Sequence, residues 1–478
     1  MNRGHLAIHG HFYQPARDDP FTGRSAPEPD AGPREGWNAR IAAECYAPNA
    51  ESGNFGRIGF DLGPTLATWL RREMPVTHDA IARQGAGPNV MAQAFHHTIL
   101  PLAPARDRRT EIRWGLRDAE LRFGHRPLGI WLPETAVDVL TLRIAADEGV
   151  RYTILAPWQA ATSGLDTRRL YRVELGGDRH IVVAFYEGGL SASVSFESGA
   201  TSDAHRFATD RLAPVLAEPL PDGSPAMALI ATDGELYGHH KSFRELFLAS
   251  LTGPTGVHRD FEVTTIGALV ADEHRPHLPL MAIRDQTSWS CHHGVLRWSG
   301  ECPDAADGRW KRPLRSAFDR LAAAIDTITE REAAEIGVDL WSARDAWADV
   351  AAEFATGEEV VGRILADALH LAPARAARMA ADRSSSGRLE TILRAQRSRM
   401  AMFASDAWYW DDPSRQETTQ ALRWAAHAAR LVDVLSHTHL EATLVDDLAA
   451  LRSPAAGLDG AALYAAALRA IDQPVRMA

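Results

Sequence analysis

The chain has 478 residues, of which 45% are hydrophobic and 24% charged, and its formal net charge at pH 7 is -11. This is the composition of a globular protein long enough for two domains. The negative charge and the lack of a basic segment with interleaved aromatic residues argue against a nucleic-acid partner, and no run approaches the ~20 apolar residues that span a bilayer.

The first predicted element is a strand over residues 5 to 12, HLAIHGHF, which carries His9 and His11. Residues two apart on a strand point to the same face, so both imidazole rings are expected to project together. The pair indicates a functional site, or else two hydrogen-bonded histidines at the edge of a loop. The N-terminus lacks the apolar core of a secretory signal, which predicts a cytoplasmic protein.

Residues 16 to 88 form a long stretch rich in glycine and proline, which we expect to be irregular and which has the length of a binding loop. After it, strand-like runs alternate with helical patterns. Strands are predicted over residues 89–95, 128–133, 152–157, 180–186 and 226–234, and helices over 114–124, 136–149 and 241–251. This alternation predicts an α/β domain with a parallel sheet over residues 1–275.

Reactive side chains follow the ends of these predicted strands. They are His9, His11, His96, His97, Glu134, Gln159, Asp233 and Glu235. In a parallel β/α barrel the carboxyl ends of the strands share one rim, where enzymes of this architecture assemble their sites. Polar residues commonly begin loops, so each of these residues alone is weak evidence of a catalytic role. Their shared position at the carboxyl ends of strands predicts that they line one pocket.

Residues 276–312 are expected to connect the sheet domain to a second domain and to pack on both. This connector holds Trp289 and two of the three cysteines, Cys291 and Cys302; the third is Cys45. The cysteines are scattered and lack a paired C-x-x-C spacing, so the sequence predicts neither a disulfide framework nor a structural zinc site.

A helical domain is predicted over residues 313–478, because apolar residues recur there at three-to-four spacing. Ser414 and Glu417 have the spacing of a capping box and predict a helix that runs to about Leu435. Just before it, Trp408, Tyr409 and Trp410 are consecutive aromatic residues, which cannot all be buried on one helix face. At least one should be exposed, either at a substrate groove or as a wedge between domains.

Two carboxylates on different strands, together with neutral donors and aromatic rings, are the equipment for cleaving a glycosidic bond. One carboxylate attacks or stabilises the oxocarbenium-like centre. The other is held protonated and gives its proton to the leaving oxygen. The sequence thus favours a hydrolytic or glycosyl-transferring enzyme that works without a metal or other cofactor.

Four ordered motifs resemble those of glycoside hydrolase family 57. They are HGHFYQP at residues 9–15, AQAFHHTILPL at 92–102, GIWLPE at 129–134 and TDGELYGHH at 232–240. The resemblance implies an incomplete (β/α)7 barrel followed by a helical domain, and a retaining enzyme acting on α-glucans as an amylase, glucanotransferase or branching enzyme. It implies that Glu134 is the nucleophile and Asp233 the acid/base. From the residues alone, Asp233 could instead be a turn residue before Gly234, with Glu235 as the acid.

The residues expected to bind substrate surround these two carboxylates or lie in the aromatic segment of the helical domain. They are His9, His11, Gln14, His97, Trp131, Gln159, His239, Trp289, Trp408 and Trp410. Of these, Trp131 lies within a strand, where a core position is favoured over a sugar platform, and His239 could be a structural hydrogen-bond donor. The expected partner is an α-glucan or maltooligosaccharide; the sequence leaves the oligomeric state open.

Two other functions are compatible with these residues. Related barrels bind a divalent ion and hydrolyse amides or mannosides, and His9, His11, Asp233 and His239 could be its ligands. The first strand, however, lacks the aspartate of such sites. The third possibility is a glucan-binding protein that has lost turnover, against which the presence of both Glu134 and Asp233 argues.

Overall fold

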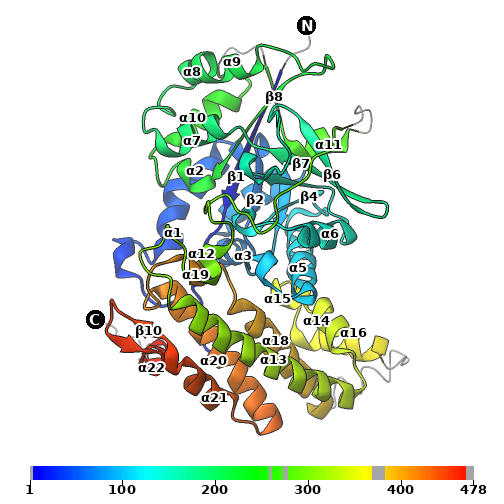
Figure 1. Ribbon diagram of the computed structural model, residues 1–478, viewed down its shortest axis with the longest axis vertical. Helices are drawn as coiled ribbons and strands as arrows, with labels where there is room; N and C mark the ends of the chain where they lie inside the picture. The colour runs from blue at the N-terminus through cyan, green and yellow to red at the C-terminus, as the bar shows by residue number, and fades with distance from the viewer. Residues whose placement is uncertain (1–3, 258–260, 273–277, 369–382, 470–478) are drawn as a thin grey trace. The chain divides into compact units, whose positions relative to one another are not determined.

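The computed structural model describes residues 4–257, 261–272, 278–368 and 383–469 (Figure 1). The expected domain boundary between residues 275 and 276 lies outside these residues. The chain divides into two compact units. The first holds residues 1–14, 27–95 and 115–292, and the second holds residues 15–26, 96–114 and 293–478.

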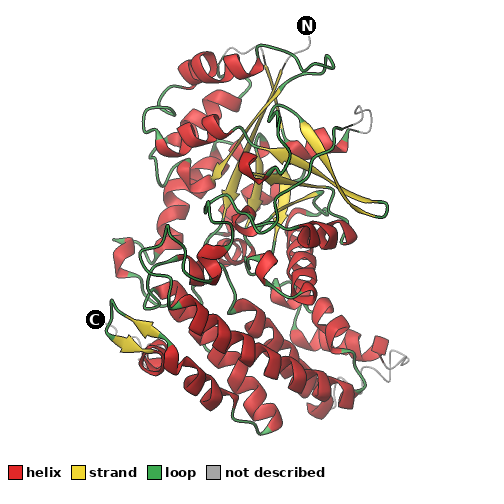
Figure 2. Cartoon of the chain, viewed as in Figure 1, coloured by secondary structure: helices red, strands yellow, loops and turns green. Residues whose placement is uncertain are grey.

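The first unit is built on one nine-stranded sheet (Figure 2). Its strands are β1 (Gly4–Phe12), β2 (Gly59–Leu62), β3 (Val90–Gln93), β4 (Gly129–Trp131), β5 (Tyr152–Leu155), β6 (Leu170–Gly176), β7 (Arg179–Phe185), β8 (Met227–Asp233) and β9 (Phe261–Thr264). They lie in the order β6-β7-β5-β4-β3-β2-β1-β8, and β9 also pairs with β1. All pairs are parallel except β6 with β7.

The parallel strands from β7 to β8 form the incomplete (β/α)7 barrel that the sequence predicts. The two ends of the curved sheet approach each other just beyond β7, where the amide of Glu187 donates to the carbonyl oxygen of Leu229 on β8, 2.7 Å away. Buried side chains from the strands, among them Ile154 and Leu229, fill the core with Trp131 and Tyr152. The interior of the barrel is therefore filled with side chains, and polar side chains gather at the carboxyl ends of its strands.

The helices around the sheet are α1 (Trp37–Ile41), α2 (Ala47–Glu51), α3 (Pro64–Glu73), α4 (Pro75–Gln84), α5 (Ala105–Phe123), α6 (Val139–Asp147), α7 (Gly188–Phe196), α8 (Ala204–Phe207), α9 (Ala213–Leu216), α10 (Arg244–Thr252) and α11 (Ile266–Ala271). On α5, Gly115 allows close packing, because a Cβ there would lie 1.6 Å from the carbonyl oxygen of Gln93 on β3.

The stretch from residue 16 to 88 differs from the expected irregular loop. It contains β2 and the helices α1 to α4. Strand β2 is short and holds a glycine and an aspartate, which have low strand propensity, so its sequence resembles a turn. Its register with β1 places Asp61 beside His11.

The second unit is helical. Its elements are α12 (Leu296–Ser299), α13 (Lys311–Ile336), α14 (Leu340–Ala346), α15 (Ala348–Ala351), α16 (Gly357–Ala368), α18 (Arg383–Ala401), α19 (Asp406–Tyr409), α20 (Gln416–Ser436), α21 (Leu440–Asp447) and α22 (Gly460–Arg469), with a hairpin of β10 (Arg452–Ser453) and β11 (Leu458–Asp459). The long helices α13, α18 and α20 pack together as its centre (Figure 1). No helix in the described ranges is long and apolar enough to cross a membrane.

Candidate active site

His9 and His11 project from the same face of β1, as the sequence predicts, and both reach one carboxylate. Nε2 of His9 lies 2.7 Å from Oδ1 of Asp61, and Nδ1 of His11 lies 2.8 Å from Oδ2. Burial disfavours a charged ring, but Asp61 outweighs it and raises the pKa of His11 to about 9. His11 is therefore a buried cation at neutral pH, paired with Asp61.

Asp61 was absent from the sequence-based set of candidates. It is fully buried, and its pKa lies below the usual value because the two histidines outweigh the cost of burial. Its only local signature is a single acidic residue in a short run of apolar residues and glycines. Such a residue becomes informative once β2 is recognised as the neighbour of β1.

Aromatic rings surround the two histidines. Trp131 stacks on His9 at a centroid distance of 4.8 Å and on His11 at 5.3 Å. Trp289 meets Trp131 edge-on at 5.0 Å and lies 6.1 Å from His11. The Trp131 ring is completely buried, so it orients the histidines as part of the core, whereas Trp289 is only partly buried.

Further rings extend this aromatic group. Tyr186, at the end of β7, lies 6.5 Å from Trp289 and 6.1 Å from Trp158. Trp158 is 38% exposed and donates its indole proton to the carbonyl oxygen of Ser288, 2.9 Å away. Sugars bind proteins partly by stacking on such rings, and Tyr186 and Trp158 were not among the sequence-based candidates.

Glu134 follows β4 in a strained turn. Its φ is 56° and that of Thr135 is 46°, in the left-handed region that a β-branched threonine strongly disfavours. The hydroxyl of Thr135 donates to Oε1 of Gln159 at 2.9 Å. Strained backbone of this kind persists where surrounding contacts determine it, and it clusters at functional sites.

Gln159 supplies those contacts. Its side-chain oxygen accepts from Thr135 and from the amide of Ala156, and its amino group donates to the carbonyl oxygen of Thr135 and the hydroxyl of Thr287. These bonds use the full capacity of a side-chain amide, and Gln159 is completely buried. The expectation that Gln159 contacts substrate is therefore replaced by a role in holding the Glu134 turn.

A second segment holds the Glu134 carboxylate itself. The Trp289 indole donates to Oε2 of Glu134 at 3.2 Å, and the Ser290 hydroxyl donates to the same oxygen at 2.6 Å. The amide of Trp289 also donates to the carbonyl oxygen of Glu134 at 3.0 Å. That Trp289 binds substrate stays a prediction, and the structure shows that it holds a candidate catalytic group. Ser290 was not among the sequence-based candidates.

Asp233 ends β8 and is paired in register with His11 on β1. Burial of its carboxyl group, opposed by His11 and reinforced by the negative charges of Glu134 and Asp61, raises the pKa of Asp233 to about 6. Asp233 is nevertheless exposed, so solvent can reach it. Trp289, which binds Glu134, lies 6.1 Å from His11. His11 is the register neighbour of Asp233, so both carboxyl groups lie near the same histidine.

The residue after Asp233 must be small. A Cβ at Gly234 would lie 2.3 Å from the ring of Phe12. Glu235 follows and is buried, where its Oε1 accepts from the hydroxyl of Tyr46 at 2.6 Å, and Gln14 hydrogen-bonds the same hydroxyl. Burial raises the pKa of Glu235 to about 7, so Glu235 is a buried second acid behind Asp233.

Three of the other candidates have structural partners of their own. His239 binds Glu44 through Nδ1, and His97, in the helical unit, binds the hydroxyl of Ser405 at 2.6 Å. Trp408 is completely buried in the helical unit, between Phe403 and Phe318, so it presents no ring face to solvent. The exposed member of the aromatic segment is Trp410, at 37%.

The ligand set of the alternative metal hydrolase does not come together. The ring nitrogens of His9 and His11 nearest Asp61 are bonded to that carboxylate, and His239 is directed to Glu44. Asp233 is left with His11 as its cationic neighbour. The arrangement presents two carboxyl groups, one in a fixed orientation and one with a raised pKa, and a set of aromatic rings.

The model of the glycosyl hydrolase family 57 matches residues 6–274, and that of a domain of unknown function, DUF3536, matches residues 307–473. An α-amylase from Pyrococcus horikoshii is 26% identical over 132 residues. That match covers 26% of this chain and only 20% of the amylase.

Solved structures with the same fold cover nearly the whole chain. A maltose-forming amylase from Pyrococcus sp. ST04 has a TM-score of 0.71 at 14% identity, over 97% of this chain and 88% of that one. A family 57 branching enzyme from Pyrococcus horikoshii has a TM-score of 0.61 at 14% identity, over 98% and 94%. At this identity the likeness concerns the fold.

Proposed function

Because this chain belongs to glycoside hydrolase family 57, we propose that it cleaves α-glucans by a retaining mechanism and passes the glycosyl group to water or to another sugar. The names of the structural relatives, a maltose-forming amylase, a branching enzyme and a 4-α-glucanotransferase, support an α-linked glucan as substrate. The aromatic rings of Trp289, Tyr186 and Trp158 supply stacking surfaces for it.

Glu134 acts as the nucleophile. Its carboxylate attacks the anomeric carbon and forms a covalent glycosyl-enzyme, which the acceptor then releases. The bonds from Trp289 and Ser290 fix Oε2, which leaves the other oxygen, Oε1, to attack. The strained turn at Glu134 and Thr135 keeps the side chain directed into the site.

Asp233 acts as the acid and then as the base. A pKa raised to about 6 keeps about half of its carboxyl groups protonated at pH 6 and about a tenth at pH 7, so the proton that the leaving oxygen requires is available in mildly acidic to neutral solution. Glu235 also has a raised pKa, but it is buried and its Oε1 is bonded to Tyr46. Accessibility therefore favours Asp233 as the proton donor.

His11 contributes a positive charge beside Asp233. When Asp233 has given up its proton, the cationic ring stabilises the resulting carboxylate, which then serves as base toward the acceptor. Asp61 keeps His11 charged and fixes its orientation together with that of His9. His9, His11 and Asp61 thus allow Asp233 to alternate between its protonated and ionised forms.

The observation that carries the proposal is the pair of unlike carboxyl groups in one site, Glu134 held by two donors and Asp233 with its raised pKa. The test is incubation with amylose and with maltooligosaccharides, followed by analysis of reducing ends, chain lengths and branch points. Activity on either substrate, absent from Glu134→Gln, is expected. A wild-type chain that leaves both substrates unchanged would contradict the proposal.

A further inference from the structure

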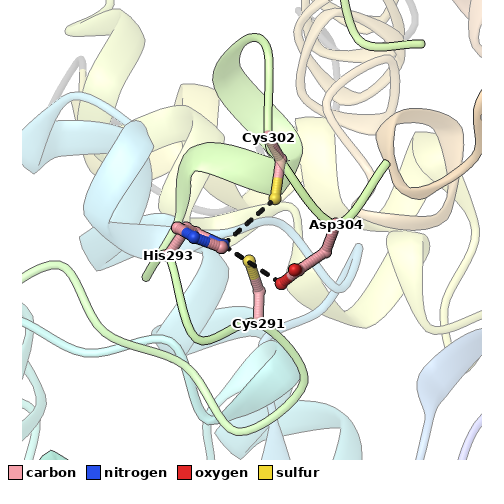
Figure 3. A group of neighbouring side chains, drawn as sticks. All are labelled: Cys291, His293, Cys302 and Asp304. Carbon is pink, nitrogen blue, oxygen red and sulfur yellow. Dashed lines mark hydrogen bonds and ion pairs between the residues drawn. The ribbon is translucent and has the colours of Figure 1, made fainter. Parts of the chain in front are cut away.

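We propose that Cys291, His293, Cys302 and Asp304 bind a zinc ion that secures the loop carrying Trp289 and Ser290. One ligand atom from each of the four residues can be chosen so that all lie within 4.8 Å of one another. Figure 3 shows the four side chains directed toward a common point. Within the part of the chain that the structure describes, no other group of this kind is found.

The distances suit a small tetrahedral ion. Nδ1 of His293 lies 3.0 Å from Oδ2 of Asp304, and Sγ of Cys302 lies 3.7 Å from Nδ1 of His293. Bonds of about 2.0 Å to nitrogen or oxygen and 2.3 Å to sulfur place neighbouring ligand atoms of a tetrahedral zinc site about 3.3–3.8 Å apart. An ion at the common point therefore needs only small side-chain movements.

The spacing explains how one loop can supply four ligands. Cys291 and His293 are two residues apart, as are Cys302 and Asp304, so each pair can present its side chains together. The short helix α12 lies between the two pairs in the sequence, and its Trp298 is buried. The sequence showed no C-x-x-C pattern, and this C-x-H with C-x-D arrangement becomes recognisable only when the loop is folded.

The chemistry of the ligands favours zinc over harder ions. Two thiolates and an imidazole are the ligands of structural zinc sites, whereas magnesium and calcium require oxygen ligands. Binding releases one proton from each cysteine thiol and leaves neutral imidazole and ionised carboxylate in place. Both cysteines are buried while His293 and Asp304 are exposed, so the ion would have a buried side at the two sulfur atoms and a side open to solvent.

The site has a consequence for the proposed reaction and, in this respect, rests on the proposed function. Cys291 directly follows Ser290, whose hydroxyl, together with the Trp289 indole, binds the Glu134 carboxylate. The hydroxyl of Ser288 also lies 3.4 Å from the carbonyl oxygen of Cys291. An ion on Cys291 would thus fix the end of the segment that orients the nucleophile. It would be a structural ion that takes no part in the chemistry.

No family match assigns these residues a role. They lie after residue 274, where the family 57 match ends, and before residue 307, where the DUF3536 match begins. The ion would therefore be a feature of the loop that follows the barrel.

The test measures metal by elemental analysis in the full chain, produced with zinc in the medium and dialysed against metal-free buffer. We expect close to one zinc per chain. His293→Ala and Cys302→Ser should lower zinc affinity more than about tenfold. The matched controls His292→Ala, the neighbouring histidine, and Cys45→Ser, the buried cysteine outside the loop, should retain zinc like the wild type. Cobalt exchanged into the wild type should give the visible bands of tetrahedral coordination and a sulfur-to-metal charge-transfer band.

A wild-type chain with less than about a tenth of an equivalent of zinc that also fails to bind added zinc or cobalt would overturn the proposal. Retention of zinc by both ligand variants would do the same, because the ion would then lie elsewhere. These measurements are independent of turnover, so a chain that binds zinc but leaves glucans unchanged would contradict the proposed function alone. An active chain without zinc would contradict only this inference.

Discussion

The hydroxyl of Ser290 lies 2.6 Å from Oε2 of Glu134, although the two residues are 156 positions apart in the chain. The bond joins the loop after the barrel to the turn after β4. The Trp289 indole reaches the same oxygen, so the carboxylate has two donors from consecutive residues. One oxygen of Glu134 is thus oriented by the loop rather than by the barrel.

Ser290→Ala should lower kcat/KM about 10- to 100-fold on maltooligosaccharides, because a hydrogen bond to a charged group is worth about 1.5–3 kcal/mol and a tenfold change in rate corresponds to about 1.4 kcal/mol. The melting temperature should change little, since Ser290 is exposed. Ser202→Ala removes an exposed hydroxyl that bonds only a local carbonyl oxygen and serves as the control. Equal kcat/KM in the two variants would contradict the orienting role.

Gln159→Leu should reduce both stability and kcat. The change leaves the buried Thr135 hydroxyl and the Ala156 amide without their acceptor, at a cost of about 1–3 kcal/mol in the free energy of unfolding for such groups. It also releases the strained turn at Glu134. Gln84→Leu, which removes a side-chain amide bonded to Ala50 and Gly56 on another part of the barrel unit, should cost stability but leave kcat unchanged.

Much of the barrel was predictable because its strands are apolar runs bounded by turn residues. All six predicted strands are present, and the parallel arrangement follows from their alternation with helices. Strands β2, β6 and β9 were not predicted. The four residues of β2, GFDL, include a glycine and an aspartate of low strand propensity, and the strand is defined by pairing with β1 and β3. A short strand fixed by its neighbours cannot be recognised from local sequence.

The candidate site likewise contains residues that the sequence predicts and residues that only the fold reveals. Glu134 and Asp233 were accessible from sequence because each stands at a strand end within a motif. Asp61 was missed with its strand, and Ser290 was missed because its role depends on a loop contact across the sequence. Gln159 illustrates the converse error: it lies at a strand end and looks available, but its hydrogen-bonding capacity is used within the protein.

In the helical unit, the predicted capping box is wrong. Helix α20 begins at Gln416 with Arg415 as its N-cap residue and no side-chain cap, and the amide of Ser414 instead donates to the carboxylate of Asp412 at 2.9 Å. Asp412 also accepts from Ser453 near the C-terminal hairpin. A different local contact, made by a carboxylate that the hairpin also binds, thus stands in place of the cap that the spacing suggested.

Trp408→Ala and Trp410→Ala should separate a core role from a surface role. Trp408 is completely buried, so its loss should lower the free energy of unfolding by about 3–5 kcal/mol. Trp410 is partly exposed and stacks on Arg415 at 4.3 Å, so its loss should affect stability far less. Denaturant unfolding of both variants measures this, and a larger loss for Trp410→Ala would contradict the assignment. A rise in KM confined to Trp410→Ala would support the predicted sugar contact.

Asp233 should make the protein less stable as pH rises. Its pKa is raised from the ordinary 3.8 to about 6 in the folded state, so the folded chain binds the proton more tightly than the unfolded chain does. The resulting stabilisation is complete below about pH 3.8 and is lost as pH rises through about 6. Asp233→Asn should therefore be more stable than the wild type at pH 8, with the advantage shrinking toward pH 4. An advantage that is independent of pH would contradict the raised pKa.

The roles of Glu134 and Asp233 can be separated by azide, a small anion that can replace either carboxylate. In Glu134→Ala, azide should attack from the nucleophile's side and give a glycosyl azide of inverted, β configuration from an activated α-glycoside. In Asp233→Ala, Glu134 still forms the covalent intermediate, so azide should release an α-glycosyl azide with retention.

Asp233→Ala should also slow the cleavage of natural maltooligosaccharides far more than that of aryl glycosides, whose leaving groups scarcely need a proton. Tyr46→Phe, which removes the hydroxyl bonded to Glu235 and Gln14, should leave the configuration of the product unchanged. An α-glycosyl azide from Glu134→Ala would mean that another residue is the nucleophile, and retained turnover of maltooligosaccharides by Asp233→Ala would transfer the acid role to Glu235.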